Sequence, residues 1–579
     1  MSTVRKVVII GGVAGGATAA ARLRRLDEEA QIIMVERGEY ISFANCGLPY
    51  YIGGIITDRS RLLVTTDESM RSRYRINVRP RTEARRIDPD TKEVELYDFT
   101  EDRTYTETYD ELVLSPGASP IRPPIEGIDD PRIFTLRNVP DTDAIKNFVE
   151  QKQPKRALVV GGGYIGLEMA ESLHHAGLQV TICERLEQVM MPLDFEMAAL
   201  VHRHMQVRNI EFYLKDGVSK FISHPDRVDV VLESGKTIST DMVLFSIGVR
   251  PEVELAKSAG LKIGTSGGIW VDEHLRTSDE HIYAIGDAIE TTHLVTQEKF
   301  LVRLAGPANK QGRIAADNIC GRQERYTGSL GTGIVRVFDV SVGSTGANAN
   351  MLQRAGIAYR ASVTHSASHA GYYPGAVPIS IKVLFAPEDG KILGAQVIGL
   401  DGVDKRLDVF ATAITSGATV ADLEELELAY APPYGSAKDP VNIAGYVAHN
   451  ILRDDVQAVF WSDVDRVCEA GSCCILDVRT PSECRNGIVQ GAINIPVDDL
   501  RDRLDELPRD KRILVYCQVG LRAYIACRIL KQRGFDVRNL SGGYKTYEIA
   551  TGKQANEDIY QYDRVTLKDD IIKVKDASQ

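Results

Sequence analysis

The stretch Val7-Val8-Ile9-Ile10-Gly11-Gly12-Val13-Ala14-Gly15-Gly16 decides the fold class of this chain of 579 residues. Its apolar run leads into a glycine cluster and then into an Ala- and Leu-rich stretch, Ala17 to Leu26. A second apolar run, Ile32 to Val35, ends at Glu36. This order predicts a strand, a tight turn, a helix and a second strand, as in a dinucleotide-binding βαβ unit.

The same order returns later in the chain. Ala157 to Val160 precede a second glycine cluster, a helical stretch follows, and Val180 to Cys183 end at Glu184. Glycines let the backbone approach a pyrophosphate at the helix N-terminus, and the final carboxylate accepts hydrogen bonds from a ribose. Two units therefore indicate two dinucleotides. The residues expected to contact them are Gly11, Gly12, Val13, Ala14, Gly15, Gly16 and Glu36 in the first unit, and Gly161, Gly162, Gly163, Tyr164, Ile165, Gly166 and Glu184 in the second.

The carboxylate of the second unit also bears on the choice of cofactor. Glu184 favours NADH, because a carboxylate at this position repels the 2′-phosphate of NADPH. The neighbouring Arg185 keeps NADPH open as an alternative.

Composition narrows the class of protein. Hydrophobic residues make up 44% and charged residues 26% of the chain, as in ordinary globular proteins, and the length suggests about four domains. The net charge of −11 argues against nucleic acid as a partner. Nine cysteines are too sparse for a secreted disulfide framework, and no apolar run approaches the roughly 18 residues of a membrane span. We expect a cytoplasmic protein that does not bind membranes.

A third segment, Thr277 to Asp287, predicts a strand that runs into a Gly-Asp turn. It resembles the second FAD motif of the two-dinucleotide-binding flavoprotein reductases, and Glu111 to Ala118 resembles the strand that returns from the NADH domain in that family. The resemblance covers about residues 1–450. It implies FAD as a cofactor, with Ser115, Gly117, Gly286 and Asp287 at its site.

The segment Ser42-Phe43-Ala44-Asn45-Cys46-Gly47-Leu48-Pro49-Tyr50 carries one cysteine. Glutathione-reductase-like enzymes have two cysteines here, so Cys46 cannot close an internal disulfide. It must cycle through a mixed disulfide, a persulfide or a sulfenic acid. This context resembles the single-cysteine branch, which contains coenzyme A-disulfide reductases, NADH oxidases and NADH peroxidases.

Four polar residues favour the coenzyme A member of that branch. Arg22 and Arg25 lie three apart, on one face of the predicted helix, where the resemblance implies that they hold phosphates. The alternative is a solvated basic face that also includes Arg24. Ser42 and Asn45 lie beside Cys46, where a pantetheine arm needs hydrogen-bond partners.

Two tyrosine-containing segments, His369 to Pro374 and Leu428 to Tyr434, also resemble coenzyme A-disulfide reductases, whose tyrosines reach the cysteine of the other subunit. The resemblance implies a homodimer with shared active sites. Tyr372 and Tyr430 match best, and Tyr373 and Tyr434 match less well. A phenol can protonate or hydrogen-bond a departing thiolate, whereas the alternative role is packing.

The last part of the chain resembles a rhodanese domain. Its central feature is Cys517-Gln518-Val519-Gly520-Leu521-Arg522, after the apolar run Ile513 to Tyr516. A loop that enters a helix directs backbone N–H groups inward, and Arg522 adds positive charge, so the loop favours an anionic persulfide on Cys517. The related phosphatase loop is one residue longer. The cysteines at 468, 473, 474 and 484 have no metal-site spacing, so we expect incidental thiols and no metal.

The predicted fold is α/β, with two Rossmann-like domains (FAD and NADH), an α+β dimerisation domain and a C-terminal α/β rhodanese-like domain. The expected boundaries are 1–150 and 276–330 for the FAD domain, 151–275 for the NAD(P)H domain, 331–450 for dimerisation, 451–456 for a linker, 457–553 for rhodanese and 554–579 for a tail.

The leading hypothesis is an NADH-dependent reductase of the S–S bond in coenzyme A disulfide, a coenzyme A-linked persulfide or polysulfide, in which Cys517 relays sulfane sulfur to Cys46. One alternative is an NADH oxidase or peroxidase with a sulfenic acid cycle. The other is a sulfur-carrier or redox-sensing protein with a regulatory flavin module. Whether coenzyme A is a substrate or a held cofactor stays open.

Overall fold

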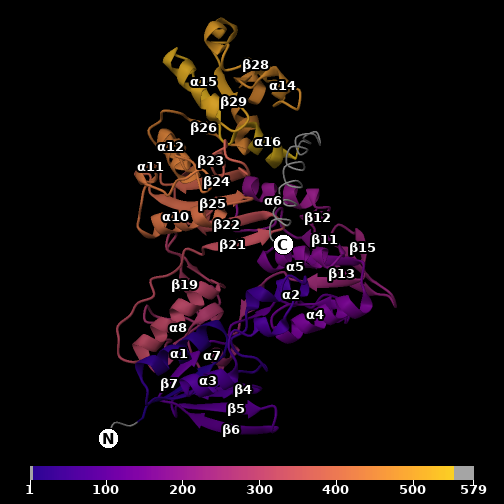
Figure 1. Ribbon diagram of the computed structural model, residues 1–579, viewed down its shortest axis with the longest axis vertical. Coiled ribbons are helices and arrows are strands. Elements are labelled where there is room, and N and C mark those ends of the chain that lie inside the picture. The colour runs from indigo at the N-terminus through magenta and orange to yellow at the C-terminus, as the bar shows by residue number, and fades with distance from the viewer. Residues whose placement is uncertain (1–3, 553–579) are drawn as a thin grey trace. The chain divides into compact units, whose positions relative to one another are not determined.

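The computed structural model describes residues 4–552, which form two compact units (Figure 1). One unit consists of the described residues up to Met190 together with Arg208–Gly331. The other consists of Met191–Val207 and the described residues from Thr332 onward. The tail predicted at 554–579 lies outside the described residues.

The first glycine cluster lies where sequence analysis predicts it, between a strand and a helix. Strand β1 (Lys6–Ile10) leads into helix α1 (Ala14–Leu26), and β2 (Gln31–Val35) follows. In the parallel sheet Ile10 lies opposite both Val35 and Leu114, so three strands end together at the glycine turn. The sheet order is β18-β7-β1-β2-β3, with β18 at Ile282–Ala284, β7 at Glu111–Leu114 and β3 at Asn77–Arg79.

The second cluster repeats this arrangement. Strand β10 (Arg156–Val160) leads into α5 (Tyr164–His175) and β11 (Gln179–Glu184). The sheet order is β12-β11-β10-β16-β9, with β12 at Glu211–Leu214, β16 at Met242–Phe245 and β9 at Ile133–Phe134. All four of its strand pairs are parallel. The two Rossmann-like folds expected from the sequence are therefore confirmed.

Smaller elements complete the first unit. Two three-stranded antiparallel sheets and two two-stranded sheets flank the parallel ones. Their strands are β4 (Thr82–Asp88), β5 (Glu93–Asp98) and β6 (Arg103–Thr108); β13 (Val218–Ser223), β14 (Val228–Leu232) and β15 (Thr237–Thr240); β8 (Ala118–Pro120) with β17 (Val249–Pro251); and β19 (Thr291–Thr292) with β20 (Lys299–Phe300). The helices are α2 (Leu48–Ile52), α3 (Asp67–Tyr74), α4 (Val139–Lys152), α7 (Glu254–Ser258) and α8 (Ala305–Ile319).

An antiparallel sheet with helices forms the first half of the second unit, as expected for an α+β dimerisation domain. Its order is β21-β22-β25-β24-β23, at Gly333–Val337, Val340–Gly346, Ile392–Gly399, Pro378–Phe385 and Arg360–Ala367. The helices are α9 (Ala349–Arg354), α10 (Val403–Thr415), α11 (Asp422–Glu425) and α12 (Pro440–Leu452).

One helix from the predicted NAD(P)H domain groups with this second unit. Helix α6 (Phe195–Val207) and the residue before it supply two buried carboxylates to a buried amine. Lys382 Nζ lies 2.7 Å from Asp194 Oδ2 and 2.5 Å from Glu196 Oε1. A buried ammonium needs such partners, so this ion-pair cluster ties the helix to strand β24.

The rhodanese-like part contains a parallel sheet in the order β26-β30-β29-β27-β28, at Ala458–Val459, Val537–Leu540, Arg512–Tyr516, Cys473–Asp477 and Ile493–Asn494. Its α-helices are α13 (Val464–Val467), α14 (Pro481–Cys484), α15 (Leu521–Gln532) and α16 (Gly543–Thr551). Within the second unit it contacts strand β23 directly. The Val363 N–H donates to Ser541 Oγ at 3.1 Å, and His365 Nε2 lies 2.8 Å from Thr546 Oγ1.

Candidate functional site

Cys46 lies in a single 3₁₀ turn, Asn45–Gly47, directly before α2. The cysteine is exposed and free. Partial burial of the thiol raises the pKa of Cys46, and the carboxylates of Glu168 and Asp287 raise it further. The protein groups that act on this sulfur are thus acidic, and they favour the thiol over the thiolate.

The first glycine turn has the shape that a pyrophosphate requires. Gly11 has φ +98°, and a Cβ there would lie 2.0 Å from the carbonyl oxygen of Ser115. A Cβ on Gly16 would lie 1.9 Å from the carbonyl oxygen of Gly11. Side chains are therefore excluded at both positions, and the backbone is left bare for a ligand.

Val13 stands at the position where the usual pattern has its second glycine. It is the N-cap of α1 with φ −96°, a value open to any residue. The equivalent Gly163 has free space around it and φ −80°. This position does not require glycine, so Val13 leaves the turn intact.

The two predicted acids, Glu36 and Glu184, occupy equivalent positions. The Gly12 N–H donates to Glu36 at 2.9 Å, and the Gly162 N–H donates to Glu184 at 2.7 Å. The second oxygen of each accepts from a later backbone N–H, at Gly38 and Leu186. These bonds fix each carboxylate beside its turn. Its contact with a ribose stays a prediction.

Asp287 fits a hydroxyl-bearing cofactor. It lies in the 3₁₀ turn Gly286–Ala288, where the Gly286 N–H donates to Gln311 Oε1 at 2.7 Å. Burial raises the pKa of Asp287, an effect that Arg303 offsets in part, and within residues 4–552 the carboxyl group has no hydrogen-bond partner. Buried carboxyl groups are normally hydrogen-bonded, so this one suits a ligand donor such as a ribityl hydroxyl.

The other predicted residues of this cofactor site lie close by. Ser115 Oγ lies 3.1 Å from the position of a Cβ on Gly15, and Gly117 follows with φ +74° and free space around it. Ala14 begins α1 after the first glycine turn, and Tyr164 and Ile165 begin α5 after the second. The glycine turns, the acids and Asp287 together fit FAD and a nicotinamide dinucleotide.

The three arginines of α1 differ sharply in environment. Arg22 pairs with Asp317 of α8 at 2.7 Å, and Arg25 is exposed. Arg24 is buried and donates five hydrogen bonds to backbone carbonyls, including those of Tyr74 and Ala30. The alternative of a solvated basic face is therefore wrong for Arg24. The phosphate-binding role of Arg22 and Arg25 stays a prediction.

The two polar residues predicted beside the thiol lie on the same loop as Cys46. Ser42 has φ +46°, and its N–H donates to the Gly12 carbonyl at 2.8 Å, which joins the loop to the first glycine turn. Asn45 is exposed in the turn that carries Cys46.

Tyr372 and Tyr430 form a pair in the second unit. Their hydroxyl oxygens lie 2.8 Å apart, and 75% of Tyr372 and 48% of Tyr430 are exposed. This hydrogen bond raises the pKa of Tyr372. Tyr373 instead packs its ring against His369, with 5.7 Å between centroids. Because both side chains are exposed, this pair of phenols does not serve to pack the hydrophobic core.

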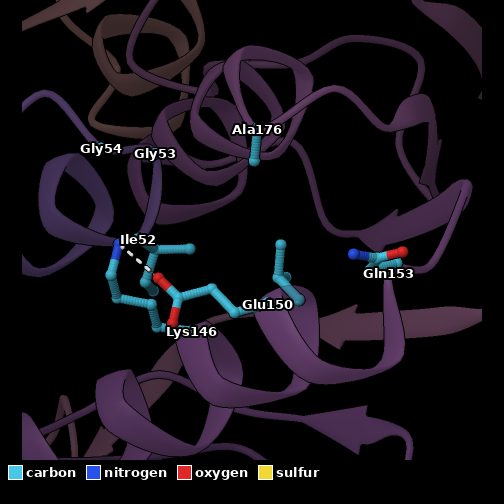
Figure 2. A pocket seen from close by; sticks show the side chains of 8 residues that line it. Ile52, Gly53, Gly54, Lys146, Glu150, Gln153 and Ala176 are labelled. Atoms are coloured by element: carbon cyan, nitrogen blue, oxygen red, sulfur yellow. Dashed lines mark ion pairs between the residues drawn. The ribbon is translucent and has the colours of Figure 1, made fainter.

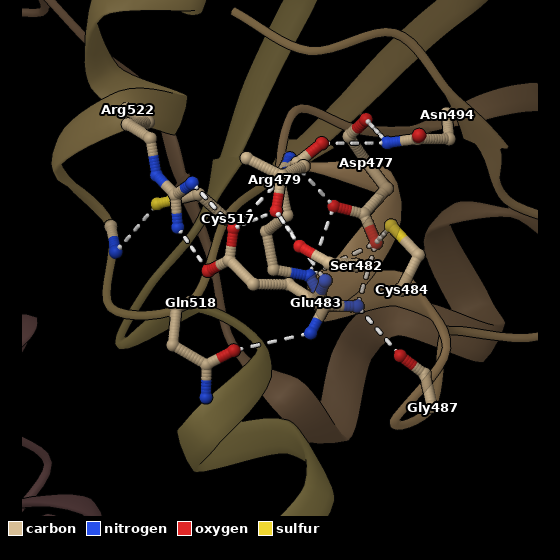
Figure 3. A network of polar contacts seen from close by, with 12 residues as sticks. Asp477, Arg479, Ser482, Glu483, Cys484, Gly487, Asn494, Cys517, Gln518 and Arg522 are labelled. Atoms are coloured by element: carbon tan, nitrogen blue, oxygen red, sulfur yellow. Dashed lines mark hydrogen bonds and ion pairs between the residues drawn. The ribbon is translucent and has the colours of Figure 1, made fainter.

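Cys517 lies at the carboxyl end of β29, almost fully buried (1% exposed), in the loop that enters α15. Gly520, with φ +116°, turns its N–H toward Cys517 Sγ at 3.1 Å. Arg522 interacts electrostatically with this sulfur, and its guanidinium makes two bonds to Glu483, of 2.6 and 2.7 Å. Figure 3 shows Arg522 between Cys517 and Glu483. Part of the positive charge expected from Arg522 is therefore neutralised.

A second arginine, Arg479, also bonds to the loop that carries Cys517. Arg479 forms a buried ion pair with Asp477 at 2.7 Å and donates to Gln518 Oε1 at 3.1 Å (Figure 3). Cys484 donates to Asp477 at 3.3 Å, and burial and that carboxylate raise the pKa of Cys484 to about 11. Cys484 thus stays a thiol near neutral pH.

Two other cysteines correct the expectation of incidental thiols. Cys468 and Cys473 form a disulfide, with their Cα atoms 4.8 Å apart. A 3₁₀ turn, Glu469–Gly471, reverses the chain between them, and Gly471 has φ +75°. The sequence shows the five-residue spacing but not this reversal.

Sequence reasoning did not assign roles to Tyr50 and Glu168. Tyr50 follows Cys46 by four residues, and Glu168 follows the last glycine of the second turn by two. The two side chains interact electrostatically, and burial raises the pKa of Glu168 to about 7. The i, i+4 spacing from Cys46 was the available signal for Tyr50, whereas the interaction with Glu168 depends on the fold.

A surface cavity of about 310 Å³ lies near this region, between α2, α4 and α5 (Figure 2). Ile52, Gly53 and Ala176 line it, together with Lys146 and Glu150, which form an ion pair of 3.4 Å. Cys46 is not among the lining residues.

Among residues 4–552, no helix combines the length and the hydrophobicity needed to cross a membrane.

Comparison with protein families gives three matches along the chain. The model described as pyridine nucleotide-disulphide oxidoreductase matches residues 5–312, and that of its dimerisation domain matches 333–439. The model of the rhodanese-like domain matches residues 461–550.

Individual relatives cover most of the chain. A coenzyme A disulfide reductase of Staphylococcus epidermidis is 37% identical over 444 residues, which are 76% of this chain and 99% of that protein. The crystal structure of reduced Bacillus anthracis CoADR-RHD has a TM-score of 0.93 and 52% identity, covering 96% of this chain and 99% of that one. The structure of a NAD-dependent persulfide reductase from A. fulgidus has a TM-score of 0.88 and 40% identity. The match covers 94% of this chain and 100% of that one.

Proposed function

Because the chain belongs to the pyridine nucleotide-disulphide oxidoreductases, we propose that it is an NADH-dependent flavoprotein that reduces S–S bonds in coenzyme A disulfide, or in a coenzyme A-linked persulfide or polysulfide. The observation that carries the proposal is the single exposed thiol of Cys46, in the unit that holds two dinucleotide turns. The fused rhodanese-like domain favours persulfide over the oxidase and peroxidase alternatives.

FAD, when bound at the first turn, supplies the two electrons that it takes from NADH. The thiolate of Cys46 attacks the S–S bond of the substrate, and the departing sulfur leaves as a thiol or as hydrosulfide. Cys46 is left in a disulfide or persulfide, which the two electrons reduce. A lone cysteine suffices for this cycle because the second sulfur comes from the substrate.

The enzyme in this proposal is a cytoplasmic homodimer with shared active sites. The match to the dimerisation domain supports the dimer, and the exposed Tyr372–Tyr430 pair supports the sharing. One phenol of the pair hydrogen-bonds the sulfur departing at Cys46 of the other subunit, and its partner phenol supports that bond. Arg22, Arg25, Ser42 and Asn45 hold coenzyme A in this scheme.

In the rhodanese-like domain, Cys517 takes sulfane sulfur from a donor and holds it as a persulfide. The Gly520 N–H and Arg522 lie at its sulfur, where they stabilise negative charge. The thiolate of coenzyme A then attacks the outer sulfur, the S–S bond at Cys517 breaks, and Cys517 leaves as a thiolate. The coenzyme A persulfide formed in this way is the substrate that Cys46 reduces.

Serine variants at the two cysteines test the proposal in the full-length holoenzyme. Replacing Cys46 abolishes NADH oxidation that depends on coenzyme A persulfide, with FAD content unchanged. Replacing Cys517 removes turnover only with donors that require sulfur relay, such as polysulfide. A wild-type enzyme that oxidises NADH with hydrogen peroxide but not with persulfides overturns the proposal.

A further inference from the structure

Two loops of the second unit carry the phenols that meet in the Tyr372–Tyr430 pair. The first tyrosine loop, residues 368–377, follows strand β23, and the second, residues 426–439, precedes helix α12. The two tyrosines are 58 positions apart in the chain, yet their hydroxyl oxygens lie 2.8 Å apart. Neither loop contains a helix or a strand. Side chains and single backbone bonds must therefore hold the loops together.

Arg406 of α10 joins the start of the first tyrosine loop to the end of the second. Its side chain is only 2% exposed. Nη2 donates to the Ser368 carbonyl at 2.8 Å, while Nε and Nη2 donate to the two carboxylate oxygens of Asp439, at 3.2 and 2.9 Å. Nη1 donates to the Gly402 carbonyl at 3.1 Å, which orients the guanidinium from its own helix. The planar fork of an arginine suits such simultaneous bonds.

Asp439 has further partners at the end of the second loop. Its carboxylate caps α12 by accepting from the Val441 N–H at 3.0 Å. Lys405 Nζ lies 3.5 Å from Asp439 Oδ2 and 3.4 Å from the Ala429 carbonyl, directly before Tyr430. A buried ion pair often adds little net stability over apolar side chains, so this one suits a role in fixing a single geometry.

Backbone bonds lead from this ion pair to the phenols. The Ala370 N–H donates to the Gly435 carbonyl at 2.9 Å and so joins the two tyrosine loops. The Tyr373 N–H donates back to the Ala370 carbonyl at 2.9 Å, which closes a turn around Tyr372. The loops are thus connected at three levels: the buried guanidinium, a backbone bond and the exposed phenols.

We propose that Arg406 is a positioning residue for the Tyr372–Tyr430 pair, because it holds the ends of both tyrosine loops in the arrangement in which the phenols meet. The inference rests on the proposed function, in which a phenol of this pair hydrogen-bonds the sulfur that departs from the substrate. Misplaced groups lower the rate of the chemical step. Loss of Arg406 should therefore lower kcat and leave the KM for NADH unchanged.

The test is a mutant cycle on the full-length, FAD-loaded enzyme. Arg406→Lys keeps the charge, but an ammonium group cannot reproduce the planar fork that bonds to Asp439 and Ser368. The substitution is made in the wild type and in a Tyr372→Phe/Tyr430→Phe background, which lacks both hydroxyls. The assay is NADH oxidation with coenzyme A persulfide, with FAD content measured for every variant.

Arg360→Lys is the matched control. Arg360 lies in the same unit and also bonds to a carboxylate and a backbone carbonyl, those of Asp454 and Ile451, at 3.0 and 2.6 Å. Neither partner belongs to a tyrosine loop. This variant should keep the wild-type kcat.

Arg406→Lys should lower kcat about tenfold when both hydroxyls are present and should have no further effect when both are absent, since no phenol is then left to position. Hydrogen exchange at the Ala370 amide should become faster. Asp439→Asn is a second variant, in case the lysine disturbs folding. It keeps the cap of α12, because asparagine caps as well as aspartate, and should show the same dependence on the hydroxyls.

Two results overturn the positioning role. In one, Arg406→Lys lowers kcat by the same factor with and without the hydroxyls, as a general structural defect would. In the other, Arg406→Lys and Asp439→Asn both keep the wild-type kcat. A wild type that does not turn over coenzyme A persulfide refutes the proposed function itself, whereas equal factors in an active enzyme refute only the positioning role.

Discussion

The contact between the rhodanese-like domain and strand β23 is expected to weaken in acid, through His365. Its two ring nitrogens lie 2.8 Å from Ser380 Oγ and 2.8 Å from Thr546 Oγ1, so the ring joins β24 to α16. Burial lowers the pKa of His365 well below its usual value, and the positive charge of Lys545 lowers it further. The folded contact thus requires the neutral imidazole.

The sign and size of the effect follow from proton linkage. An imidazole released from the contact binds a proton below about pH 6.5, whereas the folded one does not, so the contact loses stability as the pH falls. One pH unit below that value the loss is about 1.4 kcal/mol, and each further unit adds about as much until the folded-state pKa is reached. At pH 5.5 the equilibrium constant for opening should rise about tenfold.

Hydrogen exchange of the β23 and α16 amides at pH 7.5 and 5.5 measures this opening in the full-length enzyme. His365→Gln keeps a neutral polar side chain and should remove the tenfold dependence. His175→Gln, at a side chain that is 48% exposed on α5, is the control and should behave as wild type. His202 on α6 also has a pKa lowered to about 4 by burial, so only the difference between wild type and His365→Gln isolates His365. Equal pH dependence in the two proteins refutes the reasoning.

Three further predictions concern single residues. Arg24→Met removes five hydrogen bonds to backbone carbonyls and should destabilise the first unit by about 3 kcal/mol, seen as release of FAD at a lower temperature. Gly166→Ala places a Cβ 2.0 Å from a backbone oxygen of the second turn and should slow flavin reduction by NADH about 100-fold in stopped flow, with FAD retained. Glu483→Gln removes the two-bond ion pair that fixes the position of Arg522 beside Cys517. The loss of positioning should outweigh the charge that is unmasked and lower thiosulfate sulfurtransferase activity about tenfold, while persulfide reduction without relay is unchanged.

The features that sequence reasoning placed well are local in the chain. A strand, a glycine turn and a helix follow one another directly, so the spacing of Gly11 to Gly16 already determines the turn, and the structure has it between β1 and α1. The loop from Cys517 to Arg522 is local in the same way. In both cases one short segment carries the backbone geometry.

The features that it missed depend on contacts between distant segments. Arg22 and Arg24 are two residues apart on one helix, yet one pairs with Asp317 and the other is buried among carbonyls near Tyr74. Their opposite environments follow from what packs on each side of α1. The interaction of Glu168 with Tyr50 likewise joins residues 118 positions apart in the numbering. A pattern of neighbouring residues in the sequence cannot predict such contacts.

The surroundings of Cys46 and Cys517, the two cysteines of the proposed function, favour different states of sulfur. At Cys517 a backbone N–H and Arg522 face a buried sulfur, so negative charge on a persulfide is stabilised there. At Cys46 the neighbouring charges are the carboxylates of Glu168 and Asp287, which oppose negative charge. Under the proposed function, sulfane sulfur should therefore rest on Cys517 and pass only briefly through Cys46, where NADH-derived electrons remove it. The electrostatics of each site, rather than the order of the domains, thus favours sulfur flow from the rhodanese-like domain toward the flavin.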